Sequence, residues 1–412
     1  MAHFAFIAPP LPGHLNPLLS LAGTLVGRGH RATFLHMPDV ARLVNRSGVG
    51  FHPIGADTHP IGTLDASVAR MASLNGPFGL RAMIAETAGQ TDMIARAAPD
   101  AMRALGIDAV VADQMEPAAG LVAEHLDLPF VTTATGLPIN REPAVPPPYV
   151  DWPHDASERG VWKNRGGYRV SDWLMSGVGD VVERNAQRLG VPRRRRADQG
   201  FSPAAQLAQA VRGLDFPRKH LPDSFHYLGP FRDPDTANWS LPDPDDRPLV
   251  FCSLGTLQGS RAEIFRNVAS ACDALGLRLL IAHGGRLAVR AAARLPGDPL
   301  VYDFVPQRAV LAQCALAITH AGFNTVLDAL SFGVPLVAIP LAFEQPATAA
   351  RMARAGVAEI VPKGAGPSRL RRAVETVLAD GSYRRRASEL ATEIAGAGGV
   401  ERAADLTEAS LR

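Results

Sequence analysis

The sequence predicts an α/β fold in which two domains each contain a doubly wound parallel sheet. Short apolar runs alternate with longer amphipathic segments along the chain, and Gly or Pro marks the turns between them. One segment rich in Pro and Asp interrupts this series near the middle. In addition, 412 residues exceed what a single hydrophobic core normally supports.

The first domain is predicted over residues 1–226. Its predicted strands are the apolar runs "HFAFIAPP", "RATFLH", "DAVVAD" and "PFVTTA". Between them lie the predicted helices "NPLLSLAGTLVGRG", which ends on glycine, and "EPAAGLVAEHLDL".

The second domain is predicted over residues 249–392, with strands "LVFCSL", "RLLIAHG", "LVYDFV", "LAITHAG" and "PLVAIPL". Residues 227–248 lack an apolar period and are interpreted as a linker. We expect residues 393–412 to form a helix that packs back toward the first domain. Ligands of open parallel sheets bind beyond the carboxyl ends of the strands, so a cleft between two such sheets is the expected site.

Composition and charge exclude several classes of protein. A net charge of +2 provides no global field that would attract nucleic acid or an anionic membrane. The three cysteines form no disulfide framework, which suits a reducing cytoplasm. The N-terminus lacks the features of a signal peptide, and glycine and prolines interrupt the longest apolar run, residues 329–343.

Two further polar features are interpreted as not functional. The histidines show neither HxxxH nor paired Cys/His spacing, so no metal site is predicted. The run "RRRR" at residues 193–196 could contact lipid headgroups, but we interpret it as a solvated loop.

A polar turn in the second half predicts an anion site. The strand ending at Ile318 continues into "THAGFNT", where Gly322 permits close backbone approach and Asn324 and Thr325 suit the first turn of a helix. The free N–H groups and the dipole of that helix favour an anion, to which His320 could add a ring N–H. Alternatively, Asn324 only caps the helix and His320 is a hydrogen-bonded core imidazole.

Two other strand ends could complete a nucleotide site. Ser253 and Thr256 in "FCSLGT" could lie near the same phosphate, although such turns are common connectors. In "DFVPQ", Phe304 offers a flat face to a base, while Gln307 and the backbone near Val305 could read its edge. The alternative for "DFVPQ" is an ordinary strand end closed by proline.

The remaining candidates in the second half would bind sugars. Asp328 lies eight residues beyond His320 on the predicted helix, within reach of a ribose, and Glu344 and Gln345 could bind the hydroxyls of a hexose. Together these residues predict a nucleotide-sugar site. Dinucleotide redox and P-loop chemistry lose their main support, because no GxGxxG follows the first strand and no GxxxxGK[ST] occurs.

His14 and Asp113 are the candidate catalytic residues. His14 lies in "PPLPGHLNP", interpreted as the loop after the first strand, and Asp113 ends the strand "DAVVAD". An imidazole can remove a proton from an alcohol when its second nitrogen is oriented, and Asp113 could accept that second N–H. Neither turn holds a nucleophilic serine, so covalent acyl chemistry is not indicated. Alternatively, each residue caps the helix that follows it.

The segments "DFVPQ", "THAGFNTVLD" and "PLAFEQ" resemble the donor signature of the family 1 UDP-glycosyltransferases, and "GHLNP" with a downstream Asp resembles their catalytic pair. The resemblance implies the GT-B fold, with two facing Rossmann-like domains, and inverting transfer without a metal or a cofactor. It implies a catalytic pair of His14 and Asp113. It also implies that the UDP-glucose donor is bound by Ser253, Thr256, Phe304, Val305, Gln307, His320, Gly322, Asn324, Thr325, Asp328, Glu344 and Gln345.

The acceptor half is similar to members of this family that glucosylate carotenoid alcohols, in "GADTHPIGTL", "ADQMEPAAGLVAEHLDLPFVTTATGLPINREP", "FSPAAQLAQ" and "LDFPRKHLPDSFHYLGPFR". This implies an apolar carotenoid alcohol as acceptor and no nucleic-acid partner. We expect an open apolar channel walled by "REPAVPPPYVDW" and residues 152–173. Transient contact of a cytoplasmic protein with the inner face of the membrane would suit such a substrate, although the sequence contains no anchor.

Two residues depart from the pattern of the wider family. Phe304 stands where plant members carry tryptophan, which predicts less extensive base stacking. Asp328 replaces their glutamate and shortens the reach to the ribose. Three alternative interpretations remain. The protein could be a glycosyltransferase that acts on a sterol or polyketide alcohol, a non-catalytic binding protein of the same fold, or a sugar-nucleotide epimerase that needs no alcohol acceptor.

Overall fold

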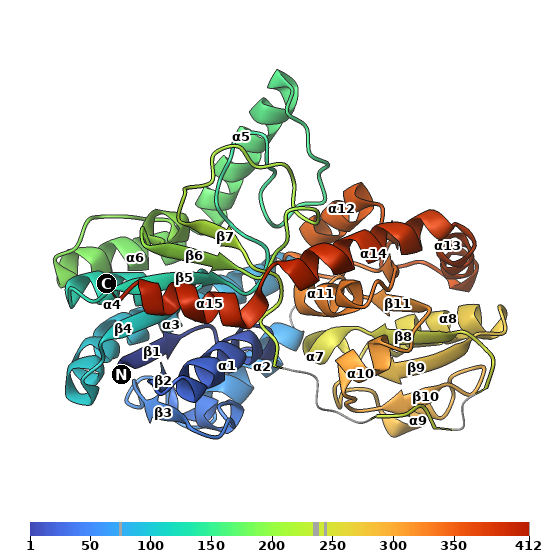
Figure 1. Ribbon diagram of the computed structural model, residues 1–412, viewed down its shortest axis with the longest axis horizontal. Helices are drawn as coiled ribbons and strands as arrows, with labels where there is room; N and C mark the ends of the chain where they lie inside the picture. Colours follow the sequence, from blue (N-terminus) through green and yellow to red (C-terminus); the bar gives the residue numbers. More distant parts are fainter. Residues whose placement is uncertain (74–75, 234–238, 243–244, 412) are drawn as a thin grey trace.

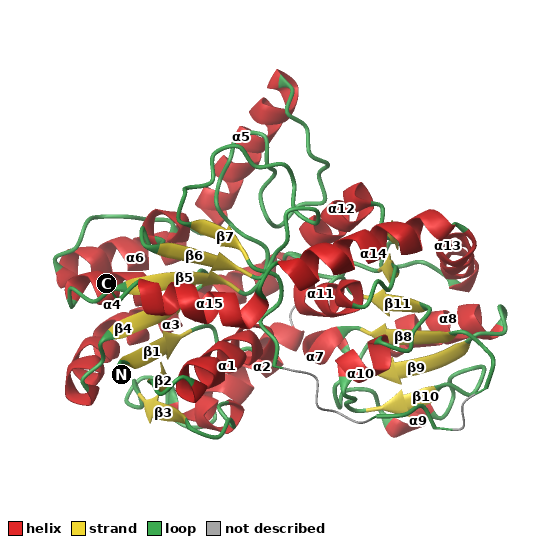
Figure 2. Cartoon of the chain, in the orientation of Figure 1, coloured by secondary structure: helices red, strands yellow, loops and turns green. Residues whose placement is uncertain are grey.

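The chain forms two parallel sheets, each covered by helices on both faces (Figures 1 and 2). This description rests on a computed structural model in which residues 1–73, 76–233, 239–242 and 245–411 are described. The predicted linker therefore lies partly outside the described residues. The predicted α/β architecture with two parallel sheets is confirmed.

The first sheet has the strand order β3-β2-β1-β4-β5-β6-β7, and its neighbouring strands pair in parallel. Its strands are β1 (His3–Ile7), β2 (Arg31–His36), β3 (Val49–Pro53), β4 (Ala109–Asp113), β5 (Phe130–Ala134), β6 (Ala205–Ala208) and β7 (Phe225–Tyr227). The helices of this part are α1 (Pro12–Gly27), η1 (Pro38–Leu43), α2 (Thr63–Ser73), α3 (Gly76–Leu105), α4 (Pro117–His125), α5 (Glu158–Leu174), α6 (Ser176–Leu189) and η2 (Ala197–Gly200).

The second sheet has the order β10-β9-β8-β11-β12-β13, again with parallel pairs. Its strands are β8 (Leu249–Ser253), β9 (Arg278–Ala282), β10 (Leu300–Tyr302), β11 (Leu316–Thr319), β12 (Leu336–Ala338) and β13 (Ala358–Ile360). The helices are α7 (Gly255–Gln258), α8 (Ala262–Asp273), α9 (Val289–Ala292), α10 (Gln307–Leu311), α11 (Phe323–Ser331), α12 (Gln345–Ala355), α13 (Pro367–Ala379), α14 (Gly381–Gly396) and α15 (Gly399–Ala409).

The central strands are mostly apolar because helices cover both of their faces. Every residue of β1, β4, β5, β8 and β9 is buried. The strand order reverses between β1 and β4 in the first sheet and between β8 and β11 in the second. Ligands of open α/β sheets bind at such reversal points, so the loops after these four strands are where a site is expected.

The C-terminal segment connects the two halves of the molecule (Figure 1). α14 packs against α11 of the second half, and α15 packs against α1 of the first. Arg28 at the end of α1 forms ion pairs with Glu401, Asp405 and Glu408 of α15. The expected single helix over residues 393–412 is instead the end of α14 followed by α15, because Gly398 adopts a left-handed φ of 92° and turns the chain there.

Candidate active site

The reversal points of the two sheets face each other, and a direct hydrogen bond joins them. The side-chain nitrogen Nδ2 of Asn324, in the first turn of α11, donates to the carbonyl oxygen of Gly13 at 2.8 Å. Gly13 lies in the first turn of α1, and the next residue is His14. The predicted catalytic and donor regions are therefore adjacent.

Pro17 explains why the Gly13 carbonyl is available for this contact. In an α-helix the carbonyl of residue 13 normally accepts from the N–H of residue 17, but proline has no N–H to donate. Asn324 supplies the missing donor from the other half of the molecule. The motif "GHLNP" thus creates a free acceptor inside a helix, and α11 uses it.

His14 and Asp113 form a hydrogen-bonded pair, together with Thr135. His14 Nδ1 lies 3.1 Å from Asp113 Oδ2 and 2.8 Å from Thr135 Oγ1, and the Thr135 hydroxyl itself donates to Asp113. The second carboxylate oxygen of Asp113 accepts from the backbone N–H of Met115 at 2.8 Å. Because these two oxygens accept from Nδ1, they favour the tautomer with the proton on Nδ1. Nε2 then carries the lone pair, and it makes no hydrogen bond to a described residue.

The predicted location of His14 in a loop is wrong. α1 begins at Pro12, so His14 lies in its first turn. Proline is favoured at the first helical position because its missing N–H would be unsatisfied there anyway. The alternative that Asp113 only caps the following helix is also wrong for α4, whose N-cap is Glu116, a buried carboxyl that accepts from Ala118 N.

The surroundings of His14 favour its protonated form. Burial acts to lower the pKa of the imidazole, but the Asp113 carboxylate outweighs it, and a smaller contribution comes from Glu344, so that the pKa of His14 is raised. Glu344 is the N-cap residue of α12, so the start of that helix contributes to the electrostatic environment of His14. The start of α11 contacts Gly13, the residue before His14.

His320 is a half-buried imidazole that restricts the backbone around it. Burial lowers the pKa of His320 to about 4, although a hydrogen bond to the backbone carbonyl of Ser253 opposes this shift. A Cβ at Gly322 would lie 2.4 Å from His320 Nε2, and one at Gly255 would lie 2.8 Å from its Cε1. Glycine is thus required at both positions by the ring itself. Ala321, between His320 and Gly322, has a strained φ of 66°.

Asp328, predicted to contact a ribose, is the centre of a polar network. Its two carboxylate oxygens accept from Arg232 Nε at 2.8 Å and from Gln307 Nε2 at 2.7 Å. Arg232 Nη2 also donates to Asn324 Oδ1 at 2.8 Å, and the Thr325 hydroxyl lies 3.5 Å from Gln307 Oε1. Four of the predicted donor residues therefore belong to one network.

The loop after β8 supplies further donor candidates. Ser253 is buried at the end of the strand, and its hydroxyl accepts from Gly255 N at 3.3 Å. Thr256 is exposed in the following turn. Beyond β10, the side chain of Phe304 is 69% exposed, whereas Val305 packs against the core of the second half.

The start of α12 holds Glu344 and Gln345. Gln345 Oε1 accepts from the backbone N–H groups of Leu341 and Ala342, both at 2.8 Å, so only its amide nitrogen remains for a hexose. Burial raises the pKa of Glu344, while the facing His14 acts to lower it. Phe343 before it has a left-handed φ of 56°, the second such strain beside the site.

Two residues of the site were missed by the sequence analysis. Thr135 follows the end of β5 and touches both members of the catalytic pair. Its position one residue beyond a predicted strand was the available signal. Arg232 lies in the segment interpreted as a linker, and no local pattern distinguished it from a solvated arginine.

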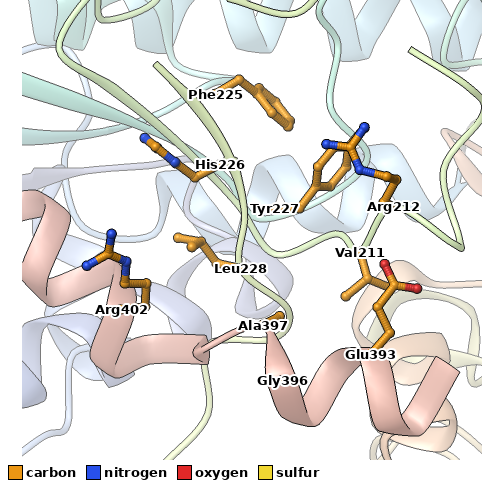
Figure 3. Close-up of a pocket in the computed structure, with 10 residues that line it drawn as sticks. All are labelled: Val211, Arg212, Phe225, His226, Tyr227, Leu228, Glu393, Gly396, Ala397 and Arg402. Carbon is orange, nitrogen blue, oxygen red and sulfur yellow. The ribbon is translucent and has the colours of Figure 1, made fainter. Parts of the chain in front are cut away.

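A cavity of about 480 Å³ lies apart from these residues, between β7 and the junction of α14 with α15 (Figure 3). None of the predicted site residues lines it. Over the described ranges, no group of three or more His, Cys, Asp or Glu side chains is arranged to hold a metal ion. In the same part of the chain, the helices are too short or too polar to cross a membrane.

Comparison with known proteins identifies the family. The sequence profile of the UDP-glucoronosyl and UDP-glucosyl transferases matches residues 94–394. The chain belongs to this family. It is therefore a glycosyltransferase, as the resemblance of its donor motif implied.

Individual family members match along their whole length. The chain is 40% identical to a zeaxanthin glucosyltransferase of Pantoea ananas, over 99% of this chain and 96% of the relative. It is 39% identical to a zeaxanthin glucosyltransferase of Pseudescherichia vulneris, over 100% of this chain and 98% of the relative. Among solved structures, the calicheamicin glycosyltransferase CalG4 superposes with a TM-score of 0.78 at 25% identity, covering 100% of this chain and 98% of that one. The GT-B fold implied by the resemblance is confirmed.

Proposed function

We propose that this enzyme transfers glucose from UDP-glucose to the ring hydroxyls of zeaxanthin, giving the β-monoglucoside and then the diglucoside. The observation that carries the proposal is the His14–Asp113 pair. Nε2 of His14 makes no hydrogen bond to a described residue, and the residue before His14 contacts the start of α11. The names of the two bacterial relatives support the acceptor and the sugar.

In the proposed reaction, His14 Nε2 removes the proton of the acceptor hydroxyl. The oxygen attacks the anomeric carbon as the bond from that carbon to the diphosphate breaks, so UDP leaves with the bonding electrons and the configuration inverts. Asp113 stabilises the imidazolium that forms, at 3.1 Å from Nδ1. Thr135 keeps the ring in the required orientation.

The donor would lie against the start of α11. The free N–H groups and dipole of that helix would stabilise the charge on the departing diphosphate, with His320 and the backbone near Gly322 beside it. Groups preorganised for such a charge contribute roughly 2.7 to 4 kcal/mol each. Ser253 and Thr256 would lie near the same phosphates.

The other donor residues would hold the rest of the nucleotide sugar. Phe304 would stack on the uracil, and Gln307 with the backbone of Val305 would contact its edge. The network of Asp328, with Thr325 beside it, would bind the ribose, and Glu344 with the amide of Gln345 would bind the glucose hydroxyls. No cofactor or metal takes part in this proposal.

The acceptor is apolar and resides in a bilayer, so we also propose that the enzyme works on the cytoplasmic side and makes transient contact with the membrane surface. Nucleic acid has no role in the proposal.

The experiment that tests the proposal is product analysis. The purified full chain is incubated with UDP-glucose and, separately, zeaxanthin, a sterol and a macrolide alcohol, and the products are analysed by mass spectrometry and NMR. We expect one and then two hexoses on zeaxanthin, in β linkage. Transfer only to the sterol or the macrolide would refute the acceptor, and sugar conversion without any acceptor would favour an epimerase.

A variant separates catalysis from donor binding. His14→Ala is expected to retain UDP binding in calorimetry and to lose roughly 10²- to 10⁴-fold in turnover, because only proton removal is affected. Turnover equal to that of the wild type would refute the role of His14 as the base.

A further inference from the structure

Helix α5 projects away from both sheets (Figures 1 and 2), and one of its sides contacts the loop that precedes it. On that side, Asn164 Nδ2 and the Tyr168 hydroxyl donate to backbone carbonyls of the preceding loop at 3.1 and 3.2 Å. Asp172 pairs with Arg141 of the same loop at 2.9 Å. A Cβ at Gly167 would lie 2.9 Å from the ring of Trp152. These contacts fix the orientation of α5.

The opposite side of α5 carries large apolar side chains in solvent. Trp162 is 75% exposed, Trp173 is 74% exposed and Val170 is 56% exposed. Together with Gly166 they recur at spacings of four, four and three residues, which places them on one helical face. Nothing lies within 4 Å of a Cβ built on Gly166. Two exposed tryptophans on one face are costly in water and indicate a contact surface.

Basic side chains surround these tryptophans. Arg159, Lys163, Arg165 and Arg169 all lie on the exposed part of α5. Among the described residues, Arg165 and Arg169 form no ion pair, and Lys163 lies over the ring of Trp152 at 4.1 Å. The exposed face of α5 therefore combines apolar rings with unneutralised positive charge.

Three of the four arginines at residues 193–196 differ in this respect. Arg194 pairs with Glu124, Arg195 with Asp180 and Glu183, and Arg196 with Asp198. These guanidinium groups are neutralised within the protein, and no exposed tryptophan accompanies them. The sequence alone made this run the more obvious candidate for lipid contact, but the structure favours α5.

We propose that α5 docks on the surface of an anionic lipid bilayer, with Trp162, Val170 and Trp173 inserted at the headgroup level. Helices with an apolar face bordered by Lys and Arg lie in the plane of the interface, and tryptophan is preferred at that depth. Each Lys or Arg near an anionic surface adds to the attraction. A second copy of the chain fits less well, because a symmetric contact would bring the basic borders of the two helices together.

The placement of α5 connects the docking surface to the active site. The segment between β5 and α5 begins at Thr135, which contacts His14 and Asp113, and it also carries Arg141, which pairs with Asp172 of α5. One loop thus runs from the surroundings of the catalytic histidine to the base of α5. This inference extends the proposed function, which supplies the reason for reaching an acceptor in a membrane.

Sedimentation with vesicles tests the docking surface without any acceptor or donor. The full chain is mixed with vesicles of phosphatidylcholine alone or of phosphatidylcholine with phosphatidylglycerol. We expect binding to the anionic vesicles that weakens with added salt, and a blue shift of tryptophan fluorescence. The double variant Trp162→Ala/Trp173→Ala is expected to bind roughly tenfold or more weakly. Arg165→Gln/Arg169→Gln is expected to lose about fivefold for each charge removed.

Matched controls separate the helix from general surface effects. Arg193→Gln/Arg195→Gln removes the same charge elsewhere, and Ile61→Ala/Val289→Ala removes two apolar side chains that are each 84% exposed. Both control variants are expected to bind vesicles like the wild type. Unchanged circular dichroism and unchanged affinity for UDP show that the α5 variants are folded.

Three outcomes would overturn the docking proposal. They are no binding of the wild type to anionic vesicles, equal binding by the tryptophan variant, and self-association of the wild type that the tryptophan variant loses while its vesicle binding stays unchanged. Failure of the proposed function would look different. In that case the vesicles are bound as described, but zeaxanthin receives no hexose.

Discussion

Replacing Asp113 with asparagine tests the central pair of the site. The substitution keeps the size and shape of the side chain but removes its charge. Asp113 is buried, and its Oδ2 lies 3.1 Å from His14 Nδ1. At an effective dielectric constant of about 20, two unit charges at that separation attract each other by about 5 kcal/mol.

This energy is an upper limit for the effect on the rate. Only part of the imidazolium charge has developed in the transition state, and Thr135 still accepts from His14 Nδ1 in the variant. We therefore expect kcat for Asp113→Asn to fall by roughly 10²- to 10³-fold, which corresponds to about 3 to 4 kcal/mol. Affinity for UDP is expected to stay unchanged, since Asp113 lies in the first half of the molecule.

The pH profile gives an independent readout. His14 must be neutral to act as a base, so activity of the wild type falls as the pH drops through the raised pKa of His14. Without the Asp113 charge, burial remains the largest influence on His14 and lowers its pKa. The acid limb of kcat/KM is therefore expected to move to lower pH in Asp113→Asn.

The matched control is Asp108→Asn, just before β4 and at the opposite end of it from Asp113. The Asp108 carboxylate accepts from the backbone N–H of His3 at 2.7 Å, far along the strand from His14. This variant loses the same charge and should keep both kcat and the acid limb. An acid limb that stays in place in Asp113→Asn, or a kcat within a factor of a few of the wild type, would refute the assigned role.

Two further predictions concern the contact between the halves and the donor site. Asp215 is buried between Arg218 and Arg351 of α12; burial raises its pKa, but the two arginines together lower it to about 2. Asp215→Asn should cost about 3 to 5 kcal/mol in urea denaturation at neutral pH, because two buried guanidinium groups lose their counterion. The difference in free energy of unfolding between the variant and the wild type should be complete above the ordinary pKa of an aspartate and should vanish as the pH falls toward 2. A difference that persists near pH 2 would contradict this prediction. For Gly322→Ala, a Cβ 2.4 Å from His320 Nε2 should displace the ring and weaken UDP binding in calorimetry, and unchanged affinity would disprove the required close approach.

The sequence analysis located most of the fold and much of the site because both depend on local patterns. The predicted strands from "HFAFI" to "PLVAIPL" all occur, since buried parallel strands are mostly apolar. The strands β3, β6, β7 and β13 were missed. Three of them, β3, β7 and β13, are edge strands that are only partly buried, so little apolar burial marks their sequences, and the buried β6 has only four residues.

Sequence by itself determined the polar strand ends on which the site is built: His14, Asp113 and the turn around Gly322 are visible because helix starts and strand ends have local residue preferences. Tertiary structure alone decided their partners. Thr135 completes the catalytic pair, Arg232 reaches Asp328 from a segment without a pattern, and Asn324 donates to the carbonyl that Pro17 leaves free. Thr135 lies 121 residues from His14, Arg232 lies 96 residues from Asp328, and Asn324 lies 311 residues from Gly13. Such contacts depend on how two sheets are ordered and face each other, which no local pattern of residues specifies.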